Sequence, residues 1–197
     1  MAARPEPVLY HFSHDGSIRL FVPRPSRLGE DFVWAVDDLH AWTYSVPREC
    51  PRASFWAQDR TSQADIDRFL DGETTRIEMV LEDRWMPEVE SATLWRYTLP
   101  PDTFISHDGI AGHWVSREPV APAALELVAD LPGRIRAAGV HLRSEPSLVA
   151  LWLEVIASSL EFSGTRLRNC HDCPDEWREP QWYARQNESK GIDHAVP

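Results

Sequence analysis

Apolar residues in this chain occur in short runs interrupted by prolines, glycines and polar turns, a pattern typical of β-strands. The runs cover residues 8–13, 32–36, 53–57, 76–81, 94–99, 113–116 and 125–128. Helical patterns are fewer: a short helix after Asp37 and Asp38, then residues 64–70, 131–138 and 146–162. The sequence therefore predicts a mixed α+β protein with short helices.

The length of the chain limits the number of domains. With 197 residues, 43% of them hydrophobic, the chain can bury one good core but is short for two full domains. We expect a single α+β domain over residues 8–169. Residues 170–197 are polar and charged and contain Pro174, Pro180 and Gly191, so we expect them to form a polar C-terminal tail.

The charge and hydropathy of the chain exclude some classes of partner. A net charge of −11 argues against non-specific nucleic-acid binding, which needs concentrated positive charge. A small anionic ligand remains compatible, because one or two arginines can bind it locally. No apolar run is long enough to span a membrane and the first residues lack a signal-peptide pattern. We expect a cytoplasmic protein without a membrane partner; no feature identifies a protein partner.

Residues 8–13, VLYHFS, place an imidazole and a hydroxyl in a short apolar strand. A histidine in such a strand needs hydrogen-bond partners. It either bonds a backbone carbonyl or directs its second nitrogen toward a cleft. In the second case His11 and Ser13 hold a ribose diol, and Arg19 or Arg24 binds a phosphate.

Large aromatic residues follow in the next strand and helix. Trp34 lies in the strand over residues 32–36, and Trp42 and Tyr44 lie in the helix after it. Such aromatics either form core or provide a platform on which a flat ring, such as a base or nicotinamide, stacks.

The cysteines offer two weaker candidates. Cys50, in the PRECPR loop, would need a basic partner to act as a nucleophile, and a loop locked by an Arg–Glu pair is the simpler interpretation. Cys170 and Cys173 have a CxxC spacing that suits zinc, but a zinc site needs four ligands. The sequence contains no P-loop, GxGxxG, HExxH or GxSxG pattern. We expect no metal cofactor.

Several longer motifs resemble those of an uncharacterised bacterial family, a domain of unknown function. They are LYHFS, FVPRP, VWAVDDLHAWTY, PRECPR, WRYTLPPDTF, GHWVSREPVAP and EFSGTRLRN. The resemblance extends from about Val8 to Asn169 and brings no established activity.

The order of elements is also similar, more distantly, to the ADP-ribosyltransferase fold, in which a small split β-sheet binds NAD. In that superfamily the first strand often reads Leu-Tyr-His. The resemblance implies that His11, next to Tyr10, contacts a ribose of NAD. It also implies that Trp34 and Tyr44 enclose the nicotinamide ring.

The catalytic glutamate of that superfamily has no direct counterpart here. It stabilises the positive charge that develops on the ribose as the glycosidic bond breaks. The equivalent position is His113, in GHWVS, and Glu118 lies five residues further on. Either Glu118 substitutes from a loop, or the glutamate is absent.

The resemblance implies an ADP-ribosyltransferase-like domain that takes NAD, or another small nucleotide-like ligand, as substrate. His11, His113 and Glu118 are then the catalytic candidates. Tyr10, Ser13, Arg19, Arg24, Trp34 and Tyr44 are the candidates for binding the nucleotide. The alternatives are a non-catalytic ligand-binding module and a protein-interaction module with a tryptophan-rich surface.

Overall fold

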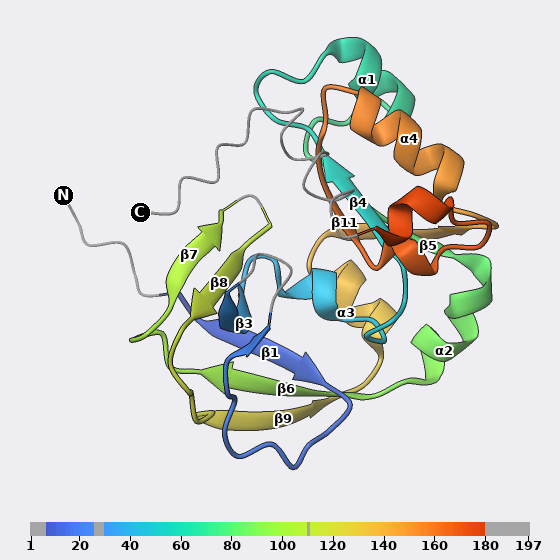
Figure 1. Cartoon of the computed structure of the whole chain (residues 1–197). Helices are drawn as coiled ribbons and strands as arrows, with labels where there is room; N and C mark the ends of the chain where they lie inside the picture. The colour runs from blue at the N-terminus through green and yellow to red at the C-terminus, as the bar shows by residue number, and fades with distance from the viewer. Residues whose placement is uncertain (1–6, 26–29, 110, 180–197) are drawn as a thin grey trace. The chain divides into compact units, whose positions relative to one another are not determined.

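The computed structural model describes residues 7–25, 30–109 and 111–179, and they divide into two compact units. In the described ranges, unit 1 comprises residues 7–25, 30–45, 93–109 and 111–129, and unit 2 comprises residues 46–92 and 130–179. Each unit contains one β-sheet, and short helices accompany the strands (Figure 1). The α+β prediction is confirmed, whereas a single domain over residues 8–169 stays a prediction.

Unit 1 is built around an antiparallel sheet in which the strands follow the order β7-β8-β3-β1-β6-β9, with β2 also paired to β3. Its elements are β1 (Leu9–Ser13), β2 (Arg24–Pro25), β3 (Asp31–Asp37), η1 (Ala41–Tyr44), β6 (Leu94–Leu99), β7 (Ile105–Asp108), β8 (His113–Ser116) and β9 (Ala124–Val128). The predicted strands over residues 94–99 and 113–116 agree with β6 and β8 residue for residue.

The two faces of this sheet carry different side chains. Leu9, Val33 and Tyr97 belong to one buried cluster and define the core face. Successive side chains of a strand point to opposite faces, so Tyr10 and Trp34 project from the other face. Val36 of β3 is the strand partner of both Tyr10 and His113. Because directly paired residues point to the same face of a sheet, His113 also lies on this second face.

The pairing of β1 with β3 is shorter than that of β1 with β6. β1 pairs with β6 over its whole length, Leu9 to Ser13. Its ladder with β3 consists of two residue pairs, Leu9 with Asp37 and Tyr10 with Val36. The sheet of unit 1 therefore opens between β1 and β3 beyond Tyr10.

Unit 2 contains a second sheet with the strand order β10-β5-β4-β11, in which β10 and β5 are parallel. Its elements are β4 (Arg52–Trp56), α1 (Gln63–Phe69), β5 (Ile77–Glu82), η2 (Asp83–Trp85), α2 (Met86–Ser91), α3 (Leu131–Ala137), β10 (Val140–Glu145), α4 (Val149–Ala157), β11 (Glu161–Thr165), η3 (Leu167–Asn169) and η4 (Asp175–Arg178). Phe55, Val80, Trp152 and Leu160 contribute to its buried core.

The predicted helix over residues 146–162 is too long at both ends. α4 spans Val149–Ala157, and β11 begins at Glu161. Ser158 ends the helix, because its backbone N–H and its hydroxyl both donate to the carbonyl of Val155. A serine that bonds the backbone in this way competes with helix continuation.

The first residues of the predicted polar tail are packed into unit 2. Cys170, Cys173 and Trp177 lie in the same buried cluster as Trp152, and Asp175–Arg178 form η4. Three apolar side chains spaced along this polar stretch thus pack residues 170–179 against the core of unit 2. Residues 180–197 lie outside the described ranges.

Asp65 provides a pH-dependent link within unit 2. Its Oδ2 accepts hydrogen bonds from the hydroxyl of Ser159 (2.5 Å), the backbone N–H of Ser159 (2.8 Å) and the hydroxyl of Ser62 (2.9 Å). The Ser159 side chain, followed by the Ser159 backbone, lowers the pKa of Asp65 from its ordinary value of 3.8. The carboxylate form therefore stabilises the fold.

Asp65→Asn is expected to lower the free energy of unfolding by about 1.5 kcal/mol at neutral pH. A lowered pKa in the folded state contributes stability above pH 3.8 that disappears as the pH falls further. Urea titrations at several pH values should therefore show a difference in the free energy of unfolding between Asp65→Asn and wild type. This difference should narrow as the pH falls below 3.8. The exposed Asp67→Asn on the same helix is the control, and an equal effect of both substitutions would contradict the prediction.

Candidate functional site

His11 lies where the sheet of unit 1 opens. Its Nδ1–H donates to the backbone carbonyl of Trp34 across the opening, at 2.9 Å. The ring also packs 4.8 Å from that of Phe21, a core residue, and is half-buried. Since a carbonyl oxygen only accepts, the neutral imidazole carries its proton on Nδ1 and its lone pair on Nε2. The carbonyl bond corresponds to the simpler of the two interpretations of this histidine.

The other two candidates on β1, Tyr10 and Ser13, make contacts of their own. Tyr10 projects from the opposite face, where the guanidinium of Arg96 lies 4.5 Å from its ring centre. The Ser13 hydroxyl accepts the backbone N–H of Asp15 at 3.1 Å, which is a local turn contact. Alternation along β1 therefore separates Tyr10 from His11 and Ser13.

Four rings meet on the second face of the sheet, and we call Trp34, Tyr44, His107 and His113 the aromatic–imidazole cluster. Trp34 lies 5.2 Å from His107 and 5.9 Å from His113, and both pairs are perpendicular. The Tyr44 hydroxyl is hydrogen-bonded to Nε2 of His113 at 2.8 Å. All four side chains are half-buried.

The structure brings Trp34, Tyr44 and His113 together from β3, η1 and β8. Sequence reasoning named all three but missed His107, because the short strand β7 was not predicted. Any ligand at the aromatic–imidazole cluster would meet apolar ring surface beside hydrogen-bonding nitrogen and oxygen atoms.

Arg19 and Arg24 are exposed and belong to the segment after β1, with Arg24 in β2 opposite Phe32. In the part of the chain that the structure describes, neither guanidinium contacts His11 or the aromatic–imidazole cluster. Their assignment to phosphate groups stays a prediction.

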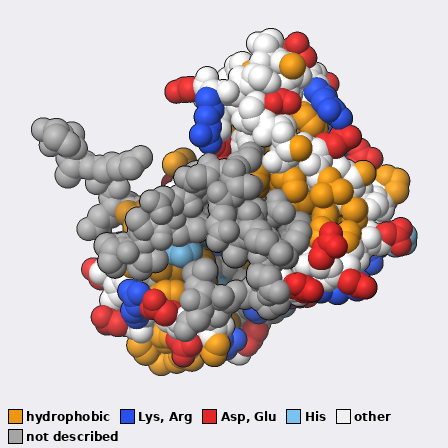
Figure 2. Space-filling view, turned by 45° about the horizontal axis from the view of Figure 1, so that its top comes forward, with side chains coloured by type: hydrophobic (Ala, Val, Ile, Leu, Met, Phe, Trp, Pro, Cys, Tyr) orange, Lys and Arg blue, Asp and Glu red, His pale blue; other side chains and the backbone are white. Residues whose placement is uncertain are grey.

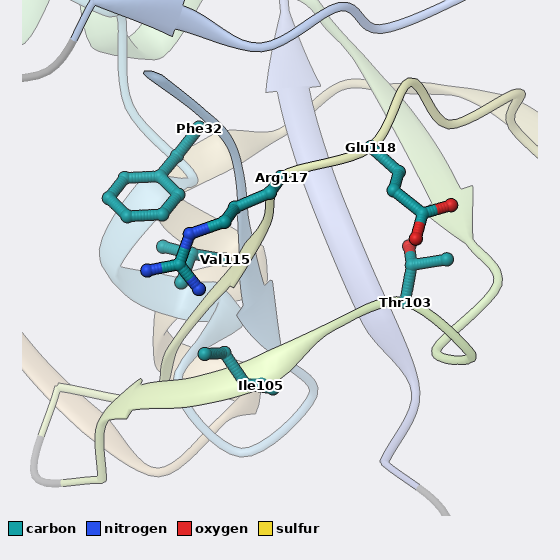
Figure 3. A pocket seen from close by; sticks show the side chains of 6 residues that line it. All are labelled: Phe32, Thr103, Ile105, Val115, Arg117 and Glu118. Atoms are coloured by element: carbon teal, nitrogen blue, oxygen red, sulfur yellow. The ribbon is translucent and has the colours of Figure 1, made fainter. Parts of the chain in front are cut away.

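Glu118 lies beyond the end of β8, away from His113 at its beginning. It lines a cavity of about 220 Å³ together with Phe32, Thr103, Ile105, Val115 and Arg117. Figure 3 shows its carboxyl group beside Thr103, while the side chain of Arg117 extends toward Phe32. The guanidinium of Arg117 also pairs with Glu30 at 2.7 Å. The structure thus separates Glu118 from the ring nitrogens of the aromatic–imidazole cluster.

The three cysteines are buried in unit 2 as free thiols. Burial raises the pKa of Cys50 to about 12 and also raises the pKa values of Cys170 and Cys173. A thiol that keeps its proton is a poor nucleophile and a poor metal ligand. Within residues 7–25, 30–109 and 111–179, no group of three or more His, Cys, Asp or Glu side chains could hold a metal ion.

Three observations bear on the expected partners. Figure 2 shows acidic and basic side chains interspersed on one face of the molecule. In the described ranges, the tryptophans are buried or half-buried, so they form no exposed patch there. None of the helices described is long and apolar enough to cross a membrane.

The fold and the site define an α+β protein with an aromatic–imidazole cluster on an opened antiparallel sheet. The chain belongs to DUF6886, a family of unknown function, whose model matches residues 10–170. This match confirms the resemblance to an uncharacterised family. Searches of curated proteins and of solved structures found no match.

Proposed function

We propose that unit 1 binds NAD or a related nucleotide and breaks the glycosidic bond between nicotinamide and ribose. The observation that carries this proposal is the aromatic–imidazole cluster beside the opening between β1 and β3. Supporting it is the resemblance of the first strand to that of ADP-ribosyltransferases.

The chemistry of the cluster suits the nicotinamide end of NAD. The oxidised nicotinamide ring is flat and positively charged, and aromatic faces attract cations. Trp34 and Tyr44 contact this ring in our proposal, and His113, held by the Tyr44 hydroxyl at 2.8 Å, lies beside the ribose. Cleavage moves the positive charge from the ring to the sugar, where a lone pair or carboxylate is needed.

In the proposal His11 supports this site from the core face of the sheet. By bonding the carbonyl of Trp34 at 2.9 Å, it fixes the segment of β3 that carries the Trp34 ring. Arg19 and Arg24 bind the phosphates in the proposal, since their side chains are long and exposed, and no ion pair joins either of them to another of the described residues. Glu118 is the less favoured group for the cation, because it lies apart from His113.

Isothermal titration with NAD, combined with chromatographic detection of nicotinamide, tests the proposal. We expect wild type to bind NAD and release nicotinamide, and Trp34→Ala to weaken binding about tenfold through loss of the ring contact. His11→Ala should weaken binding less if it only anchors β3, and as much as Trp34→Ala if it also contacts the ribose. His14→Ala, an exposed histidine in the turn after β1, is the matched control.

The outcomes separate the three functional hypotheses. Binding with release supports the enzyme. Binding without release points to a non-catalytic ligand-binding module. No heat of binding with NAD would refute the proposal and lead to affinity capture of protein partners.

A further inference from the structure

Unit 2 contains three arginines that surround one glutamate, a group that the proposed function of unit 1 does not use. Arg48 and Glu49 lie in the loop before β4, and Arg166 and Arg168 follow β11. β4 and β11 are antiparallel neighbours, and the start of β4 pairs with the end of β11 (Figure 1). The loop and the segment after β11 therefore meet at one end of this sheet. We call Arg48, Arg166 and Arg168 the arginine cluster.

Glu49 provides the carboxylate at the centre of the arginine cluster. Its Oε1 lies 3.5 Å from Nε of Arg166 and 3.9 Å from Nε of Arg48, and its Oε2 lies 3.7 Å from Nη2 of Arg168. All three distances exceed the length of a good charge-assisted hydrogen bond, about 2.7–2.9 Å. The guanidiniums thus surround the carboxylate without closing on it.

The arginine cluster holds more positive charge than Glu49 compensates. Among the described residues, Arg48 and Arg168 form their ion pairs with Glu49 alone, so at least one of these two charges lacks a counter-charge. The pKa of Glu49 reports the same local field. Burial raises this pKa, but the hydrogen bond from Asn169 and the three arginines lower it more, and the net direction is downward.

Hydrogen bonds fix the two segments that carry the arginine cluster. Nδ2 of Asn169 donates to the backbone carbonyl of Glu49 at 2.8 Å, and Nε of Arg166 donates to that of Arg48 at 3.2 Å. Arg166 has a φ of +56°, in the left-handed region that residues other than glycine rarely adopt. Strained backbone held in this way is common at ligand-binding sites. Segments that are already ordered lower the entropy cost of binding.

The accessibility of the arginine cluster suits a small anion. The side chains of Arg48 and Glu49 are exposed, whereas those of Arg166 and Arg168 are 26% and 27% exposed. A solute can therefore reach guanidiniums that are partly removed from water, where attraction to an anion is stronger. The net charge of −11 opposes the approach of an extended polyanion.

Phosphate is the anion that matches these groups. A guanidinium presents its N–H donors in a planar fork that fits phosphate oxygens. A dianionic phosphate group has acceptor oxygens for several guanidiniums, and its double charge can compensate more than one of them.

We propose that the arginine cluster binds the phosphate group of a small molecule, either inorganic phosphate or a phosphate monoester. The incoming phosphate takes the place of the Glu49 carboxylate between the guanidiniums. Glu49 is then an internal competitor, which occupies the site when no ligand is bound. This inference does not depend on the proposed function of unit 1.

Isothermal titration of the whole chain with inorganic phosphate tests the proposal, at about pH 8, where the phosphate group is mainly a dianion. Arg168→Gln should weaken binding about tenfold, because it removes one charge-assisted contact. Arg48→Gln, in an exposed loop, should weaken it as well. Glu49→Gln should strengthen binding about fivefold, because it removes a like charge from the site.

Two control variants change the net charge of the protein in the same way. Arg68 and Glu154 form an exposed ion pair elsewhere in unit 2. Arg68→Gln matches Arg168→Gln in charge, and Glu154→Gln matches Glu49→Gln. Both controls should leave phosphate binding within about twofold of wild type, since distant exposed charges are screened by salt.

A second titration, with glycerol 3-phosphate, distinguishes the two sources of the phosphate group. Tighter binding than that of inorganic phosphate indicates a phosphate monoester as the ligand, and weaker binding indicates inorganic phosphate; either result supports the site. Absence of binding in both titrations would overturn the proposal, and so would equal effects of the cluster and control substitutions. Melting temperatures measured without phosphate show that the variants compared are folded.

Discussion

Replacing Trp152 with alanine is expected to lower the free energy of unfolding of the unit 2 core by about 4 kcal/mol. Trp152 lies on α4, is 2% exposed and packs at 5.1 Å against the ring of Phe162. The backbone of Gly164 in β11 lies directly against it, since a Cβ there would be 2.5 Å from Trp152. Removing the indole leaves a cavity between α4 and β11 that rigid strand backbone cannot fill.

Guanidinium denaturation followed by circular dichroism measures this effect. Trp152→Phe is the matched control, because it keeps a ring at the contact with Phe162 and should cost less than half as much as alanine. The indole Nε1 is buried and has no hydrogen-bond partner among the described residues, so losing it removes no bond there. A loss below about 1 kcal/mol for Trp152→Ala would show that this contact does not hold the core together.

The strands that sequence reasoning predicted well have strong apolar patterns. In Leu94–Leu99, residues 94, 97 and 99 are buried and the others are half-buried, and the bounds of the strand agree with the prediction. β7, β10 and β11 were not predicted, because they are short, polar or both: β10 reads VHLRSE and β11 reads EFSGT. Such segments become strands through their neighbours in the sheet, and local sequence does not contain that information.

The candidate site was predictable as a set of residue types but less so as an arrangement. Trp34 and Tyr44 were expected together, and His113 was named separately; the structure joins all three through β3, η1 and β8. His11 was expected to contact the ribose of the same ligand, but its side chain lies on the core face because consecutive strand residues alternate. Separation of Tyr10 from His11 follows from the same rule.

Sequence reasoning missed the Asp37–His40 pair although both residues lie within one turn. Asp37 and Asp38 were interpreted as a helix N-cap, and the carboxylate of Asp37 does bond a backbone N–H three residues later. The ring of His40 also bonds this carboxylate, at 2.7 Å, and both side chains lie against Gly112, the residue before β8. The contact with Gly112 is tertiary, and a single sequence does not reveal it.

Glu78, near the start of β5, is the second residue whose replacement should have a large effect. Its carboxylate is 1% exposed and accepts bonds from Nε of Arg76 (2.5 Å), Nε of Arg143 (3.1 Å) and Nδ1 of His141 (2.7 Å). β10 lies parallel to β5, with His141 directly opposite Glu78. One buried carboxylate of β5 thus bonds Arg76, which directly precedes β5, and two side chains of β10.

Glu78→Gln is expected to lower the free energy of unfolding by about 3 kcal/mol, because it leaves two partly buried guanidiniums without their shared counter-charge. Gln keeps the size of the side chain, so the loss reports the charge and not a cavity. Glu154→Gln, which breaks an exposed pair with Arg68 in the same unit, should cost less than about 1 kcal/mol. Urea unfolding of both variants compares them directly, and equal losses would mean that burial of Glu78 adds nothing to its ion pairs. In 1 M salt the screening length is about 3 Å, so exposed ion pairs are largely screened. If Glu78→Gln still lowers the free energy of unfolding more than Glu154→Gln in this salt, the buried network is the electrostatic link between β5 and β10.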